Sequence, residues 1–515
     1  MFIVRRRVSI RKVEVMKMDE TTKKDLLKIL VDALGQGLAE QESNHEPEFM
    51  KNFLPIPEHK RVLDPDTLLI LGGRGAGKTQ LFRLLAFPNG RGALADVTGV
   101  DKLSFLDRTM WVTGYGGERN HGLKFPSQES GEIFSDTADV LDWRAFWLGL
   151  TLGSVLRHIG DFPGSNVFER IPSEIKKTLT DELQLVSVWV PMVKKELEII
   201  SFVLDKVDET LIKEDRWLFI TYDELDKLTI SHSKLAIPIR ELLAFWLDRW
   251  RRWDRIRPKI FLRNDLFAPE FLGFPDASKL QAYQIRLEWQ ASWLYQLFMK
   301  RMANSDARLL QYLQKVPDVI SKHDPILGYI PRSEERVYQD VIRNMVGQFM
   351  GKDAKKGITH RWIPNHLQDS NGRIAPRSFI KLFERAARFE LERFDLKQLP
   401  DDRLLQPTHL QGALMETSID RIRELAEEEY PWLNDLKPSL AGIEVPTAKS
   451  NILAAIRNTE WRKESKVPAS DSDGIFKVLL KLGVLETRSD GKVNMPDIYL
   501  YGFSMLRRGG IRRPK

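Results

Sequence analysis

The sequence predicts an α/β protein with a parallel-sheet core, a helical lid and a C-terminal winged-helix domain. Three observations lead to this prediction. An apolar run at residues 67–71 is followed at once by a glycine-rich loop and a helical segment. Two later apolar runs, 217–222 and 259–263, each end in acidic or amide side chains. Near the C-terminus, two helical segments precede a turn signal between two short strands.

The glycine-rich loop carries the most specific motif of the chain. Residues 72–79 match G-x-x-x-x-G-K-[ST] at every fixed position, between a strand and a helix as the motif requires. Glycines let backbone N–H groups turn toward a phosphate, and the N-terminus of the next helix adds partial positive charge. Lys78 is expected to reach the β- and γ-phosphates, and the Thr79 hydroxyl to ligate Mg²⁺. This predicts a P-loop NTPase core. The predicted nucleotide-binding residues are Gly72, Gly73, Arg74, Gly75, Ala76, Gly77, Lys78, Thr79 and Gln80.

A second strand, at residues 217–222, ends in the carboxylates Asp223 and Glu224. This is the form of a Walker B element. The first carboxylate is predicted to hold the metal ion, and the second to act as general base on the attacking water. The alternative is that both side chains cap a following helix, because Asp226 and Lys227 continue the charged run.

A third strand at residues 259–263 is followed by Asn264. An amide at this position could sense the γ-phosphate or orient water, and the alternative is a turn or helix cap. A further strand is predicted within residues 282–289. Strands alternating with helical crossovers indicate a parallel sheet.

Three stretches resemble AAA+ ATPases, especially the initiator and origin-recognition group, and related STAND-type ATPases. Residues 260–265 resemble the sensor-1 strand, and residues 287–301 resemble the last strand and first lid helix. Residues 372–379 resemble the start of the sensor-2 helix. The resemblance covers about residues 51–395. It implies Asn264 as sensor 1 and Arg377 as an arginine that reaches back to the nucleotide, the alternative for Arg377 being a surface position.

The chain departs from that family in two places. The separation of Lys78 and Asp223 is much longer than in a minimal AAA+ core. Lys279 stands where an arginine finger is expected, ahead of the fourth strand. Catalysis completed by an arginine from a neighbouring subunit is therefore not implied.

The predicted organisation has five parts. Residues 1–50 form an N-terminal extension with one amphipathic helix at 21–40. Residues 51–290 form the ATPase core, which carries a long, irregular insert at about 87–136. Residues 291–395 form the lid, 396–438 a proline-punctuated connector, and 439–515 a winged-helix domain with a basic tail. Winged helices dock on DNA or on proteins, and both alternatives stay open.

Composition sets the remaining bounds. The content of 42% hydrophobic and 29% charged residues is typical of a soluble globular protein, and the absence of cysteine excludes disulfides, Cys-ligated metals and a Cys nucleophile. The histidines, His360 and His366 included, form no metal-ligand pattern. With no signal-peptide or membrane-spanning run, the predicted location is cytoplasmic, without a membrane partner.

The net charge is +7, and basic residues cluster at both ends of the chain. Such tails suggest a phosphate-rich partner such as DNA, and solvated tails without a specific partner are the alternative. The basic residues concerned are Arg5, Arg6, Arg7, Arg11, Lys12, Arg507, Arg508, Arg512, Arg513 and Lys515.

The sequence thus predicts an ATPase that uses ATP and Mg²⁺, whose nucleotide state switches its domain arrangement, and which acts on or near DNA. ATP rather than GTP follows from the family resemblance, since no N-K-x-D motif follows the third strand. The architecture is analogous to ATPases of mobile-element and anti-phage systems. The alternative is a nucleotide-gated scaffold that recruits proteins or self-associates and hydrolyses ATP slowly or not at all. A P-loop kinase is a weaker third alternative.

Overall fold

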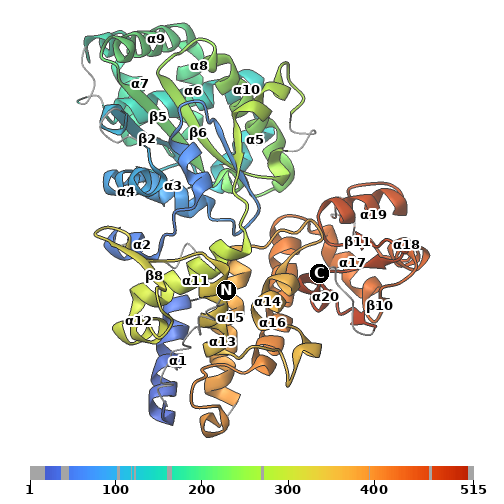
Figure 1. Ribbon diagram of the computed structural model, residues 1–515. Coiled ribbons are helices and arrows are strands. Elements are labelled where there is room, and N and C mark those ends of the chain that lie inside the picture. The colour runs from blue at the N-terminus through green and yellow to red at the C-terminus, as the bar shows by residue number, and fades with distance from the viewer. Residues whose placement is uncertain are drawn as a thin grey trace, which may run out of the picture.

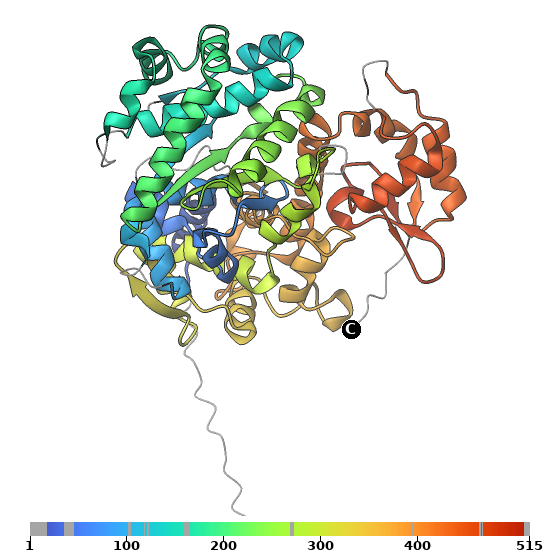
Figure 2. The same ribbon diagram turned by 90° about the horizontal axis from the view of Figure 1, so that it is seen from above.

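The computed structural model describes residues 18–35, 46–100, 105–117, 119–120, 123–158, 160, 165–267, 272–393, 395–462, 465 and 467–508. Figure 1 shows three parts: a sheet domain (residues 46–290) at the top, a helical domain below it, and a C-terminal domain (residues 432–508) at its side. Figure 2, from above, shows the C-terminal domain beside the other two.

A five-stranded sheet with every neighbouring pair parallel forms the centre of the sheet domain. The strand order is β2-β5-β6-β1-β7. β1 lies between β6 and β7, with Leu69 paired to Ile260 on one side and to Gln284 on the other. The predicted α/β parallel sheet is therefore confirmed. The strands are β1 (Leu69–Gly72), β2 (Thr109–Gly116), β5 (Trp217–Asp223), β6 (Ile256–Arg263) and β7 (Gln284–Arg286).

Helices cover both faces of this sheet, because its strands are buried on both sides. Leu69 and Leu71 of β1 belong to one hydrophobic core, and Ile70 between them belongs to the other. The first core is covered by α6 (Val140–Leu156), α7 (Ser173–Asp181), α8 (Val186–Lys195), α9 (Leu197–Lys213) and α10 (Ala236–Trp250), with α5 (Gln128–Thr137) beside α8. The second is covered by α2 (Glu46–Asn52), η2 (Pro57–Leu63), α3 (Lys78–Ala86) and α4 (Pro88–Thr98).

The prediction of a long, irregular insert at 87–136 is wrong in one respect. This region supplies β2, the edge strand that pairs with β5, as well as α4 and most of α5. The sequence conceals β2 because Gly114 and Gly116 interrupt its apolar pattern. Gly114 is needed, since a Cβ there would lie 2.7 Å from the Tyr222 ring. The short pair β3 (Arg119–Asn120) and β4 (Leu123–Lys124) follows.

The helical domain combines the predicted lid with part of the N-terminal extension. α1 (Glu20–Leu34), predicted at 21–40, buries Leu26, Leu27, Leu30 and Leu34 in the core that the lid helices form. The hairpin β8 (Ile320–Asp324) and β9 (Gly328–Pro331) lies against α2 and α11. The lid helices are α11 (Ala291–Ser305), α12 (Ala307–Leu313), α13 (Glu335–Met345), α14 (Thr359–Leu367) and α15 (Pro376–Arg393).

The predicted connector at 396–438 is mainly one long helix, α16 (Pro407–Glu428). Its prolines do not interrupt it, because Pro407 occupies the first turn, where no backbone N–H is needed. Pro431 lies beyond its last turn. α16 packs along α15 on one side and against the C-terminal domain on the other.

The C-terminal domain contains helices followed by a hairpin, as predicted. α18 (Lys449–Arg457) and α19 (Ser472–Lys481) form the helical pair, and β11 (Glu486–Thr487) pairs with β12 (Val493–Asn494). This order is what a winged helix requires, and the winged-helix assignment stays a prediction. α17 (Trp432–Leu440), α20 (Asp497–Leu500) and the parallel pair β10 (Glu444–Val445) and β13 (Leu506–Arg507) complete the domain.

The predicted basic tails lie mostly outside the described residues; only Arg507 and Arg508 belong to the described chain. The Arg507 guanidinium donates to Asn494 Oδ1 at 2.5 Å, to the Met495 carbonyl at 2.9 Å and to Asp497. The Arg507 guanidinium is therefore hydrogen-bonded within its own domain, whereas Arg508 is exposed.

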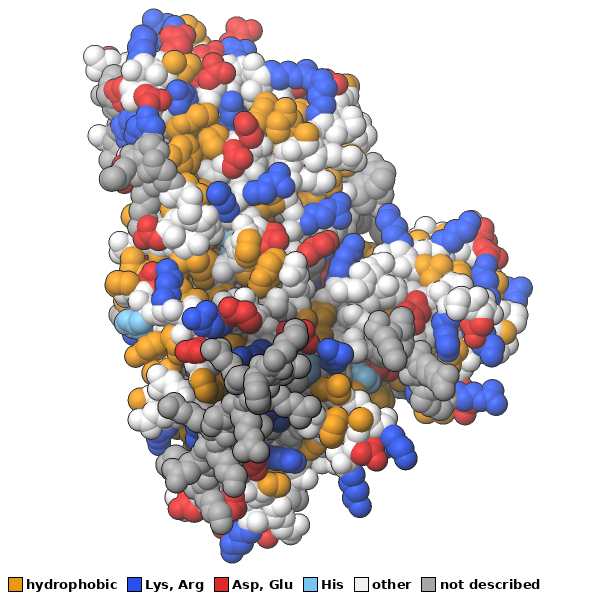
Figure 3. All heavy atoms as spheres, viewed as in Figure 1, with side chains coloured by type: hydrophobic (Ala, Val, Ile, Leu, Met, Phe, Trp, Pro, Cys, Tyr) orange, Lys and Arg blue, Asp and Glu red, His pale blue; other side chains and the backbone are white. Residues whose placement is uncertain are grey.

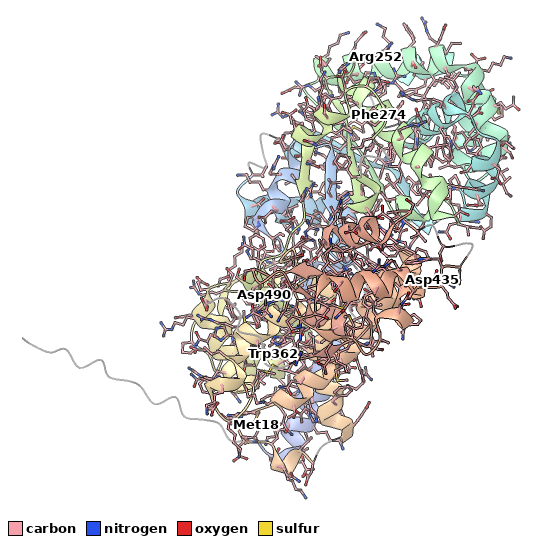
Figure 4. All side chains as sticks on the ribbon, turned by 90° about the vertical axis from the view of Figure 1, so that its right-hand side faces the viewer. Met18, Arg252, Phe274, Trp362, Asp435 and Asp490 are labelled. Carbon is pink, nitrogen blue, oxygen red and sulfur yellow. The ribbon has the colours of Figure 1, made fainter. Side chains whose placement is uncertain are left out.

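The placement of α1 in the lid core can be tested with Leu30→Ala. Figure 4 shows Met18, just before α1, at the end of the molecule opposite Arg252 of the sheet domain. Leu30 is fully buried, so the cavity should cost about 2–5 kcal/mol of unfolding free energy in the helical domain. Hydrogen exchange of lid amides measures this loss. Lys28→Ala, exposed on the same helix, should change it by less than about 0.5 kcal/mol, and equal effects of both variants would contradict the packing.

Candidate nucleotide-binding site

The phosphate loop joins β1 to α3 at the carboxyl edge of the sheet. Gly75 has φ +73° and Gly77 has φ +94°, which are left-handed conformations that favour glycine. A Cβ on Gly75 would also lie 3.1 Å from the Cβ of Arg377. Both positions therefore require glycine. Gly77 is required by its backbone conformation, and Gly75 by its conformation and by the close approach of α15.

Lys78, in the first turn of α3, folds back over the loop. Its ammonium donates to the carbonyls of Gly72 at 3.0 Å and Gly73 at 3.1 Å. Burial lowers the pKa of Lys78, and Asp223 nearby opposes that shift. A phosphate in the loop would offer this cation a stronger partner than two neutral carbonyls.

Asp223 ends β5 facing the loop and is 3% exposed. Burial raises its pKa to about 7, while the Thr79 hydroxyl, which donates to the carboxylate, acts in the opposite direction. Asp223 Oδ2 is buried and has no hydrogen-bond partner among the described residues. A hydroxyl oxygen and a carboxylate oxygen that lacks a partner are ligands of the kind Mg²⁺ takes beside substrate phosphates, so Thr79 and Asp223 fit this ion.

Glu224 has φ +55°, a left-handed conformation that costs a non-glycine residue about 1–3 kcal/mol. Its Oε1 accepts from Lys227 Nζ at 2.6 Å. Gly117, just beyond β2, lies so close that a Cβ there would be 1.9 Å from Glu224 Oε2. The fold thus holds the Glu224 carboxylate against the end of β2, a contact that sequence reasoning missed together with the strand.

Asn264 directly follows β6, the neighbour of both β1 and β5. Its side-chain oxygen Oδ1 is buried and accepts no hydrogen bond from the described residues. Because β1, β5 and β6 run in parallel, the phosphate loop, the two carboxylates and Asn264 all lie at one edge of the sheet. That edge is where ligands bind in open α/β sheets.

Arg377 comes from the helical domain, in the first turn of α15, and lies against Gly75 of the phosphate loop. Its Nη1 is 3.7 Å from Glu424 Oε1 of α16. The side chain is 14% exposed, so the alternative of a free surface arginine does not fit. The structure brings this predicted residue to the loop.

A pocket opens beside the loop, between loop residues and residues of the lid helices. Sequence reasoning missed the apolar part of this pocket, because residues 51–66 precede the first predicted strand and carry no motif. Buried His59 accepts from the Ile56 N–H at Nδ1 (3.3 Å), and burial lowers its pKa to about 3. The apolar side is formed by Phe53, Leu54, Leu297 and Ile380.

Trp289, after β7, connects the loop to the lid. Its indole N–H donates to the Ala76 carbonyl at 2.9 Å, and its ring lies 3.9 Å from where a Cβ on Gly77 would be. Lys279 lies elsewhere: it pairs with Asp276 at 3.1 Å and is not among the residues that line the pocket.

Two properties of the described chain complete the description. No group of three or more His, Cys, Asp or Glu residues in it is placed to hold a metal ion. Within the same residues, the apolar helices are all too short or too polar to cross a membrane.

Comparison with known proteins yields distant structural matches. No protein-family model matches the sequence, and no curated protein does. The chain is similar to the ORC2 protein of Aeropyrum pernix in an ADPNP-ADP complex, at 13% identity and a TM-score of 0.28, over 87% of this chain and 92% of that one. The ADP form matches at 12% identity and a TM-score of 0.29, over 92% and 94%.

Cdc6p of Pyrobaculum aerophilum matches at 12% identity and a TM-score of 0.26, over 91% of this chain and 96% of that one. These proteins are archaeal origin-recognition ATPases, the group that the sequence motifs resemble.

The raised pKa of Asp223 predicts a pH dependence of stability. The unfolded carboxyl loses its proton near its ordinary pKa of 3.8, whereas the folded one keeps it until about pH 7. The folded state binds more protons in this window, so stability should fall as pH rises from about 4 to about 7. Asp223→Asn should remove this component, measured by urea unfolding across the window. Asp181→Asn, on an exposed position, serves as control, and an equal pH profile in wild type and Asp223→Asn would contradict the burial argument.

Proposed function

We propose that this protein is a Mg²⁺-dependent ATPase of the AAA+ or STAND-like kind, whose nucleotide state controls the arrangement of its three domains. The observation that carries the proposal is the convergence of a complete phosphate loop, Asp223, Glu224 and Asn264 at one edge of a parallel sheet. Arg377 reaches the same place from a different domain.

The residues have distinct roles in this proposal. Lys78 leaves the loop carbonyls and binds the β- and γ-phosphates, while the loop N–H groups hold them. Thr79 and Asp223 hold Mg²⁺, which neutralises charge on the phosphates. Glu224 accepts a proton from the attacking water, and Asn264 orients that water or contacts the γ-phosphate. Arg377 adds a positive charge from the lid.

The adenine ring of the nucleotide would occupy the apolar part of the pocket, between η2 and the lid helices. His59 is neutral at physiological pH and uses Nδ1 as an acceptor, so its remaining ring nitrogen carries the proton. Preference for adenine is proposed from the family resemblance.

Action on DNA is proposed for the C-terminal domain and its basic tail. On the face seen in Figure 3, Lys and Arg side chains are frequent along the outer edge of the C-terminal domain. Arg507 is excluded from this role by its internal hydrogen bonds. A cytoplasmic location and a place in a mobile-element or anti-phage system remain predictions.

Two observations favour the second candidate, a nucleotide-gated scaffold with slow or no hydrolysis. The Glu224 carboxylate accepts a hydrogen bond from Lys227 Nζ at 2.6 Å, so Lys227 competes with the attacking water for this carboxylate. Lys279, at the position of an expected arginine finger, pairs with Asp276 instead.

The two candidates are separated by Glu224→Gln. If Glu224 is the base, this variant should bind ATP as the wild type does and turn it over at least about 100-fold more slowly. Calorimetry measures binding and phosphate release measures turnover. Lys78→Ala should abolish tight ATP binding, and the exposed Glu209→Gln should change neither. Unchanged turnover in Glu224→Gln would place the base elsewhere, and unchanged affinity in Lys78→Ala would refute the nucleotide site.

DNA binding is tested by deleting residues 509–515. A cut at this point keeps Phe503, Met505 and β13, which belong to the folded domain, and removes Arg512, Arg513 and Lys515. Affinity should fall, and the slope of log affinity against log salt should flatten by about 0.9 for each phosphate that the shortened chain no longer neutralises. Fluorescence anisotropy at several salt concentrations measures both, with ATP turnover in the absence of DNA as control. If the full-length chain shows no salt-sensitive DNA binding, a protein-docking role is favoured.

A further inference from the structure

A cluster of charges lies behind the phosphate loop, and the roles assigned above leave its members Arg263, Glu424 and Glu429 unused. Its cations are Arg74 and Lys78 of the loop, Arg263 of β6 and Arg377 of α15. Its anions include Glu424 of α16 and Glu429, which directly follows the last residue of that helix. Four separate elements of the chain therefore contribute charges to one region.

Arg263, at the last position of β6 just before Asn264, is the best-defined cation of the cluster. Its side chain is 6% exposed and donates to Asp265 at 2.8 and 3.0 Å and to Asp226 at 3.1 Å. Glu429 Oε2 lies 3.7 Å from Arg263 Nη2. A residue beyond the end of α16 thus reaches the strand that carries the predicted sensor.

Glu424 holds the lid side of the cluster. Its Oε1 lies 3.7 Å from Arg377 Nη1 and accepts from Lys381 Nζ at 3.0 Å. Burial and the nearby Arg377 both lower the pKa of Arg74, whereas Glu424 and Glu429 raise it. Like charges are therefore crowded at the loop, and the two carboxylates from the α16 end offset part of their repulsion.

Glu429 lies in the short segment that joins α16 to α17 of the C-terminal domain. α16 ends at Glu428 and α17 of the C-terminal domain begins at Trp432. Burial raises the pKa of Glu429, and the neighbouring Arg263, Arg421 and Lys78 oppose that shift while Asp265 adds to it. Glu429 Oε1 is buried and has no hydrogen-bond partner among the described residues. The Glu429 carboxylate is therefore held mainly by electrostatic attraction to Arg263 and not by hydrogen bonds at Oε1.

Phosphates in the loop would compete with these carboxylates for the same cations. An anionic phosphate group next to Glu429 and Glu424 would both repel them and engage their partners.

We propose that Glu424 and Glu429 are placeholder carboxylates, which occupy the loop-side arginines in the nucleotide-free protein and are displaced when a nucleoside triphosphate binds. This inference rests on the proposed function and names the residues through which the nucleotide site is regulated. Since both residues stand at the end of α16, their release frees this end of the helix from Arg263 of β6 and Arg377 of α15.

The C-terminal domain follows α16 because the two are tightly packed. A Cβ on Gly502 would lie 2.5 Å from Ile422 Cγ1, and the Gly502 N–H donates to Ser418 Oγ at 3.0 Å. Arg421 is hydrogen-bonded to Tyr499 of α20. A shift of α16 would therefore carry the domain with it. The coupling is reciprocal, so a partner that pulls the C-terminal domain away should tighten ATP binding.

The experiment uses the full chain and the variants Glu429→Gln, Glu424→Gln and their combination. Glutamine keeps the shape and removes the charge that competes with phosphate. The matched control is Glu427→Gln, exposed at the end of the same helix. Because the chain has no cysteine, Lys213→Cys on α9 and Lys477→Cys on α19, both exposed, accept spin labels at unique positions. Calorimetry with ATP measures affinity, and pulsed electron paramagnetic resonance measures the distance between the labels.

The double variant should bind ATP about tenfold more tightly than the wild type, each single variant should show a smaller increase, and Glu427→Gln should show none. In the wild type, ATP should change the distance between the labels. In the double variant the distances should already be shifted or broadened without nucleotide, and ATP should add little. A merely structural role of Glu424 and Glu429 predicts the opposite sign, a loss of affinity together with a lower melting temperature.

The failures are distinguishable. If the wild type binds ATP and the double variant binds it no more tightly than Glu427→Gln, the placeholder role is refuted and the proposed function stands. An ATP-independent label distance in the wild type refutes the coupling to the C-terminal domain. If neither chain binds ATP, both the inference and the proposed function fail.

Discussion

The parallel alignment of β1, β5 and β6 is the constraint on which the rest of the structure depends. Parallel strands end at the same edge, so each strand delivers the residues that follow it to one place. The phosphate loop, Asp223 with Glu224, and Asn264 are far apart in the sequence and meet there for this reason alone. The alternating side chains of β1, which enter two separate cores, explain why helices must cover both faces of the sheet.

The edge of the sheet concentrates charge where water is largely excluded. Asp223 and Arg263 are buried and the Glu429 side chain is 9% exposed, so each would be costly to ionise without partners. Lys78 bound to two carbonyls, Asp223 with a raised pKa and Glu429 with an unsatisfied oxygen show that this compensation is incomplete in the described chain. An anion with its metal ion would complete it, since it supplies both an acceptor for the cations and a cation for the carboxylates. In the proposals made above, this incomplete compensation would favour nucleotide binding, and the displacement of Glu424 and Glu429 would link it to the change in domain arrangement.

Local pattern was sufficient for several elements. The glycine loop, the strand before Asp223 and the strand before Asn264 were predicted because each is a short apolar run with a distinct polar end. The helix predicted at 21–40 ends at Leu34, and the long helix α16 lies where a connector was predicted, because caps and tertiary contacts, rather than periodicity, decide where a helix begins and ends. β2 was missed because Gly114 interrupts its apolar pattern. This glycine leaves room for the Tyr222 ring of the neighbouring strand, and such a tertiary requirement leaves no local signal in the sequence.

The sequence by itself determined the loop, its lysine and threonine, and the carboxylate pair, because a phosphate-binding loop imposes residue types at fixed spacing. Only the tertiary structure decided which distant residues complete the site. His59 and Phe53 reach the pocket from a segment before the first strand, Gly117 contacts Glu224 from a neighbouring strand, and Glu429 approaches Arg263 from beyond α16. No fixed separation in the sequence identifies these pairs. How close two such residues lie is set by the packing of the elements that carry them, and not by the number of residues between them.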